Sequence, residues 1–161
     1  NDEVKRGFAT AVATGYLQPK SLVLSDLAQM VRSLAAADLA ALCHQLTSFF
    51  ASIPYTMRRK DTEQERERYF HYTFYLIFRI LSTYLVLTEK QQSEGRADCI
   101  IETPKDIFIF EFKLDGTANE ALRQIESRGY ARPYEADMRH IYLVGASFSS
   151  KTGTIEEWKV K

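Results

Sequence analysis

The sequence predicts an α/β protein: a small mixed sheet with a central antiparallel hairpin, flanked by helices and preceded by an N-terminal helical segment. Two observations predict this class. In the first half, apolar residues recur at three- and four-residue spacing, which is typical of amphipathic helices. In the second half, two strand-like runs flank a turn, and a helical stretch and two further strand-like runs follow. At 161 residues and 45% hydrophobic, the chain is about one domain long and can bury a substantial core.

Charge and cysteine content restrict the partners and the compartment. With 21 basic and 21 acidic side chains, the net charge of zero excludes a polybasic nucleic-acid tail, although a local basic patch stays open. Cys43 and Cys99 are too few for a disulfide scaffold, so we expect reduced thiols and a cytoplasmic location. Because no uncharged apolar run reaches about 18 residues, we expect no membrane association.

Four helices are expected before residue 86. Polar residues that can cap a helix precede three of the apolar-periodic stretches, and Pro54 cannot continue the third. Thr62 and Glu65 have the spacing of a capping box. The predicted helices run from Glu3 to Tyr16, from Ser25 or Asp26 through Leu34, from Asp38 to Pro54, and from Thr62 to about Leu85.

The second half is expected to alternate strands and a helix. The run Thr117–Arg128 has an apolar stripe at helical spacing. His140–Val144 is a short apolar strand of the kind usually covered on both faces, and Thr154–Lys161 reads as an edge strand. Before them, the strand-like runs Arg96–Ile101 and Ile107–Lys113 are joined by a turn at Thr103–Asp106.

The turn fixes a register for this hairpin. If Thr103 faces Asp106, facing residues have numbers that sum to 209, so Asp98 faces Glu111 and Arg96 faces Lys113. Because side chains alternate along a strand, these four share one face of the sheet. The opposite face is apolar and is expected to pack in the core; it consists of Ala97, Cys99, Ile101, Phe108, Phe110 and Phe112.

Two carboxylates placed opposite each other repel, and one of them would tend to stay protonated. A shared proton, a neighbouring cation or a bound metal can relieve this repulsion. Arg96 and Lys113 could neutralise the pair in a purely structural role. Alternatively, Asp98 and Glu111 with a backbone carbonyl could bind a hard divalent cation such as Mg²⁺, and Lys113 could stabilise phosphate charge beside it. That arrangement is what metal-assisted phosphodiester hydrolysis requires.

The segments Gly95–Asp98, Ile109–Gly116 and Ala121–Ile125 resemble the PD-(D/E)XK nuclease superfamily, and most closely the group found C-terminal to bacterial AAA-ATPase-like domains. The resemblance covers about Glu67 to Lys161. It implies a restriction-endonuclease-like core over residues 61–161, with residues 1–60 as a helical connector. The proline of the family motif is absent, because Ala97 precedes Asp98.

The resemblance also implies roles for individual residues. Asp98, Glu111 and Phe112, the last through its backbone carbonyl, would bind Mg²⁺ or Mn²⁺. Lys113 would be the catalytic lysine, Glu67 an accessory acid on the preceding helix, and Gln124 a polar residue that faces the site from the following helix. For Glu67, a charged helix start is an equal alternative.

The predicted function is divalent-metal-dependent hydrolysis of nucleic acid, with DNA expected rather than RNA. An ATPase-like domain N-terminal to this segment in the same chain is the expected partner. The alternative is a catalytically inactive module of the same fold that binds nucleic acid or a partner protein. Zero net charge favours this alternative, because a nuclease groove must attract a polyanion.

Overall fold

The computed structural model describes residues 24–52, 62, 73, 77 and 97–161. The helix predicted from Glu3 to Tyr16 lies outside the described residues. Of the one predicted from Thr62 to about Leu85, Thr73 and Ile77 are described as helical and buried. The elements are α2 (Leu24–Ala35), α3 (Leu39–Ser52), β1 (Cys99–Glu102), β2 (Asp106–Leu114), α6 (Ala118–Arg128), the 3₁₀ helix η1 (Arg132–Tyr134), β3 (His140–Phe148) and β4 (Ile155–Val160).

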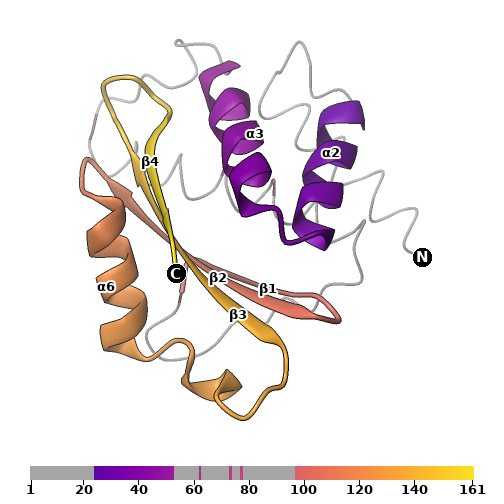
Figure 1. Ribbon diagram of the computed structural model, residues 1–161. Helices are drawn as coiled ribbons and strands as arrows, with labels where there is room; N and C mark the ends of the chain where they lie inside the picture. Colours follow the sequence, from indigo (N-terminus) through magenta and orange to yellow (C-terminus); the bar gives the residue numbers. More distant parts are fainter. Residues whose placement is uncertain (1–23, 53–61, 63–72, 74–76, 78–96) are drawn as a thin grey trace.

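The four strands form one mixed sheet in the order β1-β2-β3-β4 (Figure 1). β1 pairs antiparallel with β2, β2 parallel with β3, and β3 antiparallel with β4. Parallel neighbours need a crossover connection, and α6 lies in the segment that supplies it between β2 and β3. The predicted α/β class with a mixed sheet is confirmed.

The hairpin has the predicted register. Cys99 pairs with Phe110 and Ile101 with Phe108, so facing residues sum to 209. In the turn, the Thr103 amide donates to the Asp106 carbonyl at 2.8 Å, and the Thr103 hydroxyl accepts from the Asp106 amide at 2.9 Å. β1 begins at Cys99, later than the predicted Arg96, so Asp98 directly precedes the strand. Arg96 lies outside the described residues.

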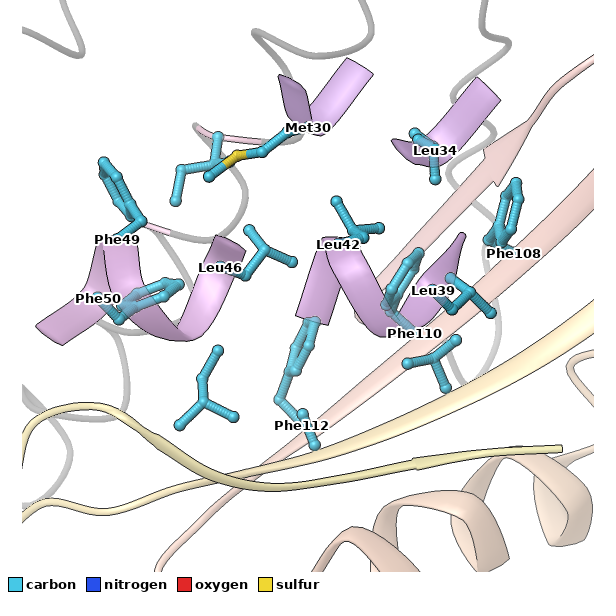
Figure 2. Close-up of a cluster of buried hydrophobic side chains, with 14 of the residues drawn as sticks. Met30, Leu34, Leu39, Leu42, Leu46, Phe49, Phe50, Phe108, Phe110 and Phe112 are labelled. Atoms are coloured by element: carbon cyan, nitrogen blue, oxygen red, sulfur yellow. The ribbon is translucent and has the colours of Figure 1, made fainter. Parts of the chain in front are cut away.

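Helices cover both faces of the sheet, which gives three layers (Figure 1). Phe108, Phe110 and Phe112 of β2 share a buried cluster with the apolar residues of α2 and α3 (Figure 2). On the other face, a second cluster joins α6 and the segment after it to the sheet; its buried members are Ile100, Ile107, Ile109, Ile125, Tyr130 and Tyr134. Glu111 lies two residues after Ile109 on β2, so strand alternation places it, with the predicted site, on the face that α6 covers.

Three local predictions need correction. Ala97 packs with the α6-side cluster and not with Cys99, because it precedes β1 and strand alternation does not extend to it. α2 begins at Leu24, before the cap expected at Ser25 or Asp26. β3 continues to Phe148, beyond the predicted Val144, because small residues after Val144 end the apolar run without interrupting the pairing. The cap at Asp38 is confirmed: its carboxylate accepts from the Ala41 amide at 3.0 Å.

The position of α6 depends on its ends and on one close contact with β3. Thr117 and Glu120 form a capping box at its start, and Gly129 ends it in the left-handed conformation with φ 67°. A Cβ atom at Gly145 would lie 2.4 Å from the Ala118 carbonyl oxygen. Glycine at this point of β3 is therefore what lets α6 approach the sheet so closely.

α3 is bound to the far edge of the sheet by polar contacts as well as by the core. The Trp158 indole donates to the Thr47 hydroxyl at 3.0 Å, and the Thr154 hydroxyl donates to the Thr47 carbonyl at 3.2 Å. The described helices include none with the length and apolar character needed to cross a membrane.

Candidate active site

Four of the predicted site residues lie together on the α6 side of the sheet. Asp98 precedes β1, Glu111 and Lys113 lie on β2, and Gln124 lies on α6. Lys113 follows Glu111 by two residues, so alternation along β2 places both side chains on the same face. Phe112, predicted to contribute its backbone carbonyl, lies between Glu111 and Lys113 on β2. Glu67 lies outside the described residues.

The two carboxylates are bound by main-chain amides of the opposing strand. Glu111 Oε2 accepts from the Asp98 amide at 3.3 Å, and Asp98 Oδ2 accepts from the Phe112 amide at 2.8 Å. The strand pairing between β1 and β2 extends only as far as Cys99 and Phe110. These two side-chain contacts therefore connect Asp98, just before β1, to the part of β2 that has no paired residue in β1. The predicted cross-strand placement of Asp98 and Glu111 is consistent with this geometry.

Gln124 connects the acid and the lysine. Its amide nitrogen donates to Glu111 Oε1, and its amide oxygen accepts from the Lys113 ammonium. The Lys113 ammonium lies 3.6 Å from Glu111 Oε1. Gln124 can contact both Glu111 and Lys113 because α6 lies close to β2. The position of α6 therefore affects how these two side chains are held.

Glu111 is a buried acid whose charge is incompletely balanced. Only 2% of the residue is exposed. Burial and, after it, the negative charge of Asp98 raise the pKa of Glu111, whereas Lys113 and the Asp98 amide lower it; the net result is a pKa of about 7. A pKa in this range means that Glu111 is partly protonated near neutral pH, and a cation placed between the two acids would displace that proton.

The donor atoms fit a hard divalent cation. Within the described residues, no group of three or more His, Cys, Asp or Glu side chains could hold a metal ion. Among the described residues, a third protein ligand would therefore be a main-chain oxygen. The Phe112 amide points to Asp98, and the N–H and C=O of one strand residue point to the same strand edge. The Phe112 carbonyl is thus directed to the edge where Asp98 lies, and all three donors are oxygen atoms, as Mg²⁺ or Mn²⁺ requires.

The opposite end of the hairpin shows how this fold balances a buried acid for structural purposes. Glu102, 6% exposed, accepts from the Arg139 guanidinium at 2.8 Å and from the Tyr134 hydroxyl at 3.1 Å. Arg139 also pairs with Asp137 at 2.6 Å. Nothing in the sequence pattern indicated this network. Among the described residues, the cation that pairs with Glu111 is the Lys113 ammonium at 3.6 Å, a longer contact than that of Arg139 with Glu102. Arg96, the other cation of the structural explanation, lies outside the described residues.

Two residues that support the site were missed. Glu157 on β4 accepts from the Ala118 amide at 3.0 Å, and the Ser147 hydroxyl donates to the Gly116 carbonyl at 2.6 Å. Together they hold the turn between Lys113 and α6. Ser147 and Glu157 are cross-strand partners, a pairing that could be predicted only once the full length of β3 was known.

Comparison with known proteins agrees with this geometry. A family model described as "PD-(D/E)XK nuclease superfamily" matches residues 65–158. The chain is 32% identical over 157 residues to an uncharacterized protein in the vnfD 5' region of Azotobacter chroococcum mcd 1. That match covers 96% of this chain and 30% of the relative, so the chain spans less than a third of the relative's length. No solved structure matches.

Proposed function

Because this chain belongs to the PD-(D/E)XK nuclease superfamily, we propose that it hydrolyses phosphodiester bonds in nucleic acid with the help of Mg²⁺ or Mn²⁺. DNA is the proposed substrate rather than RNA. The observation that carries the proposal is the pair Asp98–Glu111 with Lys113 and Gln124 beside it. An acid as buried as Glu111, facing a second acid, is maintained at a cost in stability that a site for a cation explains.

Each residue has a proposed role. Asp98, Glu111 and the Phe112 carbonyl would bind the metal, whose charge would polarise the phosphate and increase the acidity of a bound water. The Lys113 ammonium would stabilise the negative charge that develops on the phosphate. Gln124 would keep Lys113 and Glu111 in their relative positions, since its amide contacts both.

Much of the whole protein's activity would depend on parts outside this chain. The relative is more than three times as long as the segment it shares with this chain. We propose that an ATPase-like domain of the same protein precedes this one and that the protein acts in the cytoplasm. The role of Glu67 as an accessory acid is also a proposal, because Glu67 lies outside the described residues.

The test is a cleavage assay on the full-length protein with plasmid, single-stranded DNA and RNA. Cleavage is expected with Mg²⁺ or Mn²⁺ and is expected to stop with chelator. Ca²⁺ should bind but support little turnover, because its looser shell positions water poorly. Glu111→Ala should abolish metal binding and cleavage, and Lys113→Ala should abolish cleavage alone. Glu126→Ala, at an exposed acid that pairs with Lys161, is the control.

If no substrate is cut, and nucleic acid or a protein binds equally well to wild type and Glu111→Ala, the nuclease proposal is wrong. The inactive binding module would then be the better description. The zero net charge of the chain favours that alternative.

A further inference from the structure

Gln124 identifies the edge of α6 that faces the candidate active site, because its side chain contacts both Glu111 and Lys113. Residues four apart on a helix lie about 40° apart around the axis and about 6 Å apart along it. Arg128, four residues after Gln124, is therefore the next side chain along the same edge. It lies in the last turn of α6 and is exposed.

The Arg128 guanidinium forms no ion pair with any of the described residues. Lys113, Arg139 and Lys161 each form an ion pair. Among the described residues, no acid lies within ion-pair distance of Arg128. A cation in the last helical turn interacts favourably with the helix dipole, but that interaction does not depend on which edge of the helix the residue occupies.

A nucleic acid bound at the candidate active site would need cations close to it. The chain carries no net charge, and the site presents two carboxylates to a polyanion. Contacts to backbone phosphates then have to come from cations close to the site. A separation of about 6 Å along α6 corresponds to one or two nucleotides at a rise of about 3.4 Å each. A guanidinium can bind phosphate with two parallel hydrogen bonds.

We propose that Arg128 is a substrate-binding residue that contacts a backbone phosphate next to the scissile one, independently of base sequence. This inference rests on the proposed nuclease function and adds the path of the substrate: the strand runs along the Gln124–Arg128 edge of α6.

Arg123 provides a matched control on the same helix. It is also an exposed arginine and directly precedes Gln124. It lies about 100° around the helix from Gln124, on the side away from the buried Ala121 and Ile125. Replacing either arginine by alanine removes one positive charge, so the two variants differ only in where that charge stood.

The experiment measures binding of fluorescently labelled 20-nucleotide single-stranded and duplex DNA by anisotropy, with Ca²⁺, from 50 to 200 mM salt. Arg128→Ala should weaken binding roughly three- to tenfold for every base sequence and reduce the salt slope by about one. Arg123→Ala should weaken binding less than about twofold. Arg128→Lys should restore the salt slope more than the affinity, because lysine keeps the charge and loses the paired hydrogen bonds. Thermal melts check that all variants fold.

Equal effects of Arg128→Ala and Arg123→Ala would overturn the inference, and so would no effect of Arg128→Ala. If wild type cuts DNA with Mn²⁺ while Arg128→Ala binds and cuts normally, the inference alone fails and the proposed nuclease function stands. If wild type neither binds nor cuts nucleic acid, the proposed function fails and the inference with it.

Discussion

Glu111 accepts a hydrogen bond from the main-chain amide of Asp98 at 3.3 Å. The Asp98 carboxylate in turn accepts from the Phe112 amide at 2.8 Å. Each acid is therefore bound to the backbone of the opposing segment, and rotating either side chain away from the other would break one of these hydrogen bonds. Burial and, after it, this proximity raise the pKa of Glu111, which is about 7.

Replacing Asp98 by Asn tests whether this proximity is a source of strain. Asparagine keeps an oxygen that can accept from the Phe112 amide but removes the charge that opposes ionisation of Glu111. We expect the free energy of unfolding of the metal-free protein to stay constant or to rise modestly at pH 7. Chemical denaturation measures it.

Asp98→Ala is the control for that variant, because it removes the acceptor too and should cost about 1 kcal/mol. A clear loss of stability in Asp98→Asn would mean that Asp98 is a required ion-pair partner, as the structural explanation of the acid pair holds.

The stability of the metal-free protein should depend on pH through Glu111. Its pKa is about 7 in the folded state, compared with 4.5 for an ordinary glutamate. Between these values the folded state binds more protons at Glu111 than the unfolded state, so this group's contribution to stability falls as pH rises. The total loss is at most about 3 kcal/mol.

Denaturant unfolding of the metal-free protein from pH 4.5 to 8 measures this dependence. Glu111→Gln should flatten the profile across that interval, whereas Glu126→Gln, at an exposed acid, should leave it as in wild type. A wild-type profile that rises with pH and is unchanged by Glu111→Gln would contradict a raised pKa.

The sequence predicted the hairpin and its register because one short turn, Thr103–Asp106, determines all later pairs. That register predicted Asp98 opposite Glu111; the strand pairing itself ends at Cys99, and the hydrogen bond from the Asp98 amide to Glu111 Oε2 agrees with the predicted placement. Gln124 could be placed at the site only through the family resemblance, since nothing in its own helix pattern indicates what it faces.

The features that were missed depend on distant contacts. Glu157 binds the start of α6, and Arg139 binds Glu102, across long stretches of chain. Local patterns carry no information about such pairs. The end of β3 was missed for a different reason: Gly145 and its small neighbours have no strand-like side chains, and their place in the sheet is set by packing against α6.

The boundary predicted near residue 60 can be tested by expressing residues 61–161 alone. In the structure, α3 contributes Leu42, Leu46 and Phe50 to the cluster that covers one face of the sheet, and all three are fully buried. We expect this fragment to expose that face and to lack cooperative unfolding. Calorimetry checks this.

In the longer chain, Leu46→Ala should cost about 2–5 kcal/mol, while Ser48→Ala, at an exposed position on α3, should be nearly neutral. Cooperative unfolding of residues 61–161 alone would show instead that the connector is dispensable for folding.

Gly145→Ala should change the position of α6 while leaving the proposed metal-binding acids of the site unchanged. The added Cβ would lie 2.4 Å from the Ala118 carbonyl oxygen, and main chain cannot move aside as a flexible side chain can. α6 must therefore shift away from β3, and Gln124 moves with it. We expect a loss of about 1–3 kcal/mol in the free energy of unfolding, and a fall in cleavage rate with a smaller change in metal affinity, because Asp98 and Glu111 do not belong to α6.

The double variant Gly145→Ala with Ala121→Gly identifies the cause of this effect. The Ala121 Cβ and the Leu122 Cγ each lie 3.1 Å from the added atom, so Ala121→Gly relieves one of the two side-chain contacts and leaves the contact with the Ala118 carbonyl. The double variant should stay as destabilised as the single one or become more so, since glycine is also unfavourable within a helix. Recovery of stability and rate in the double variant would show that side-chain crowding, and not the approach of the α6 backbone, is the reason for glycine at position 145.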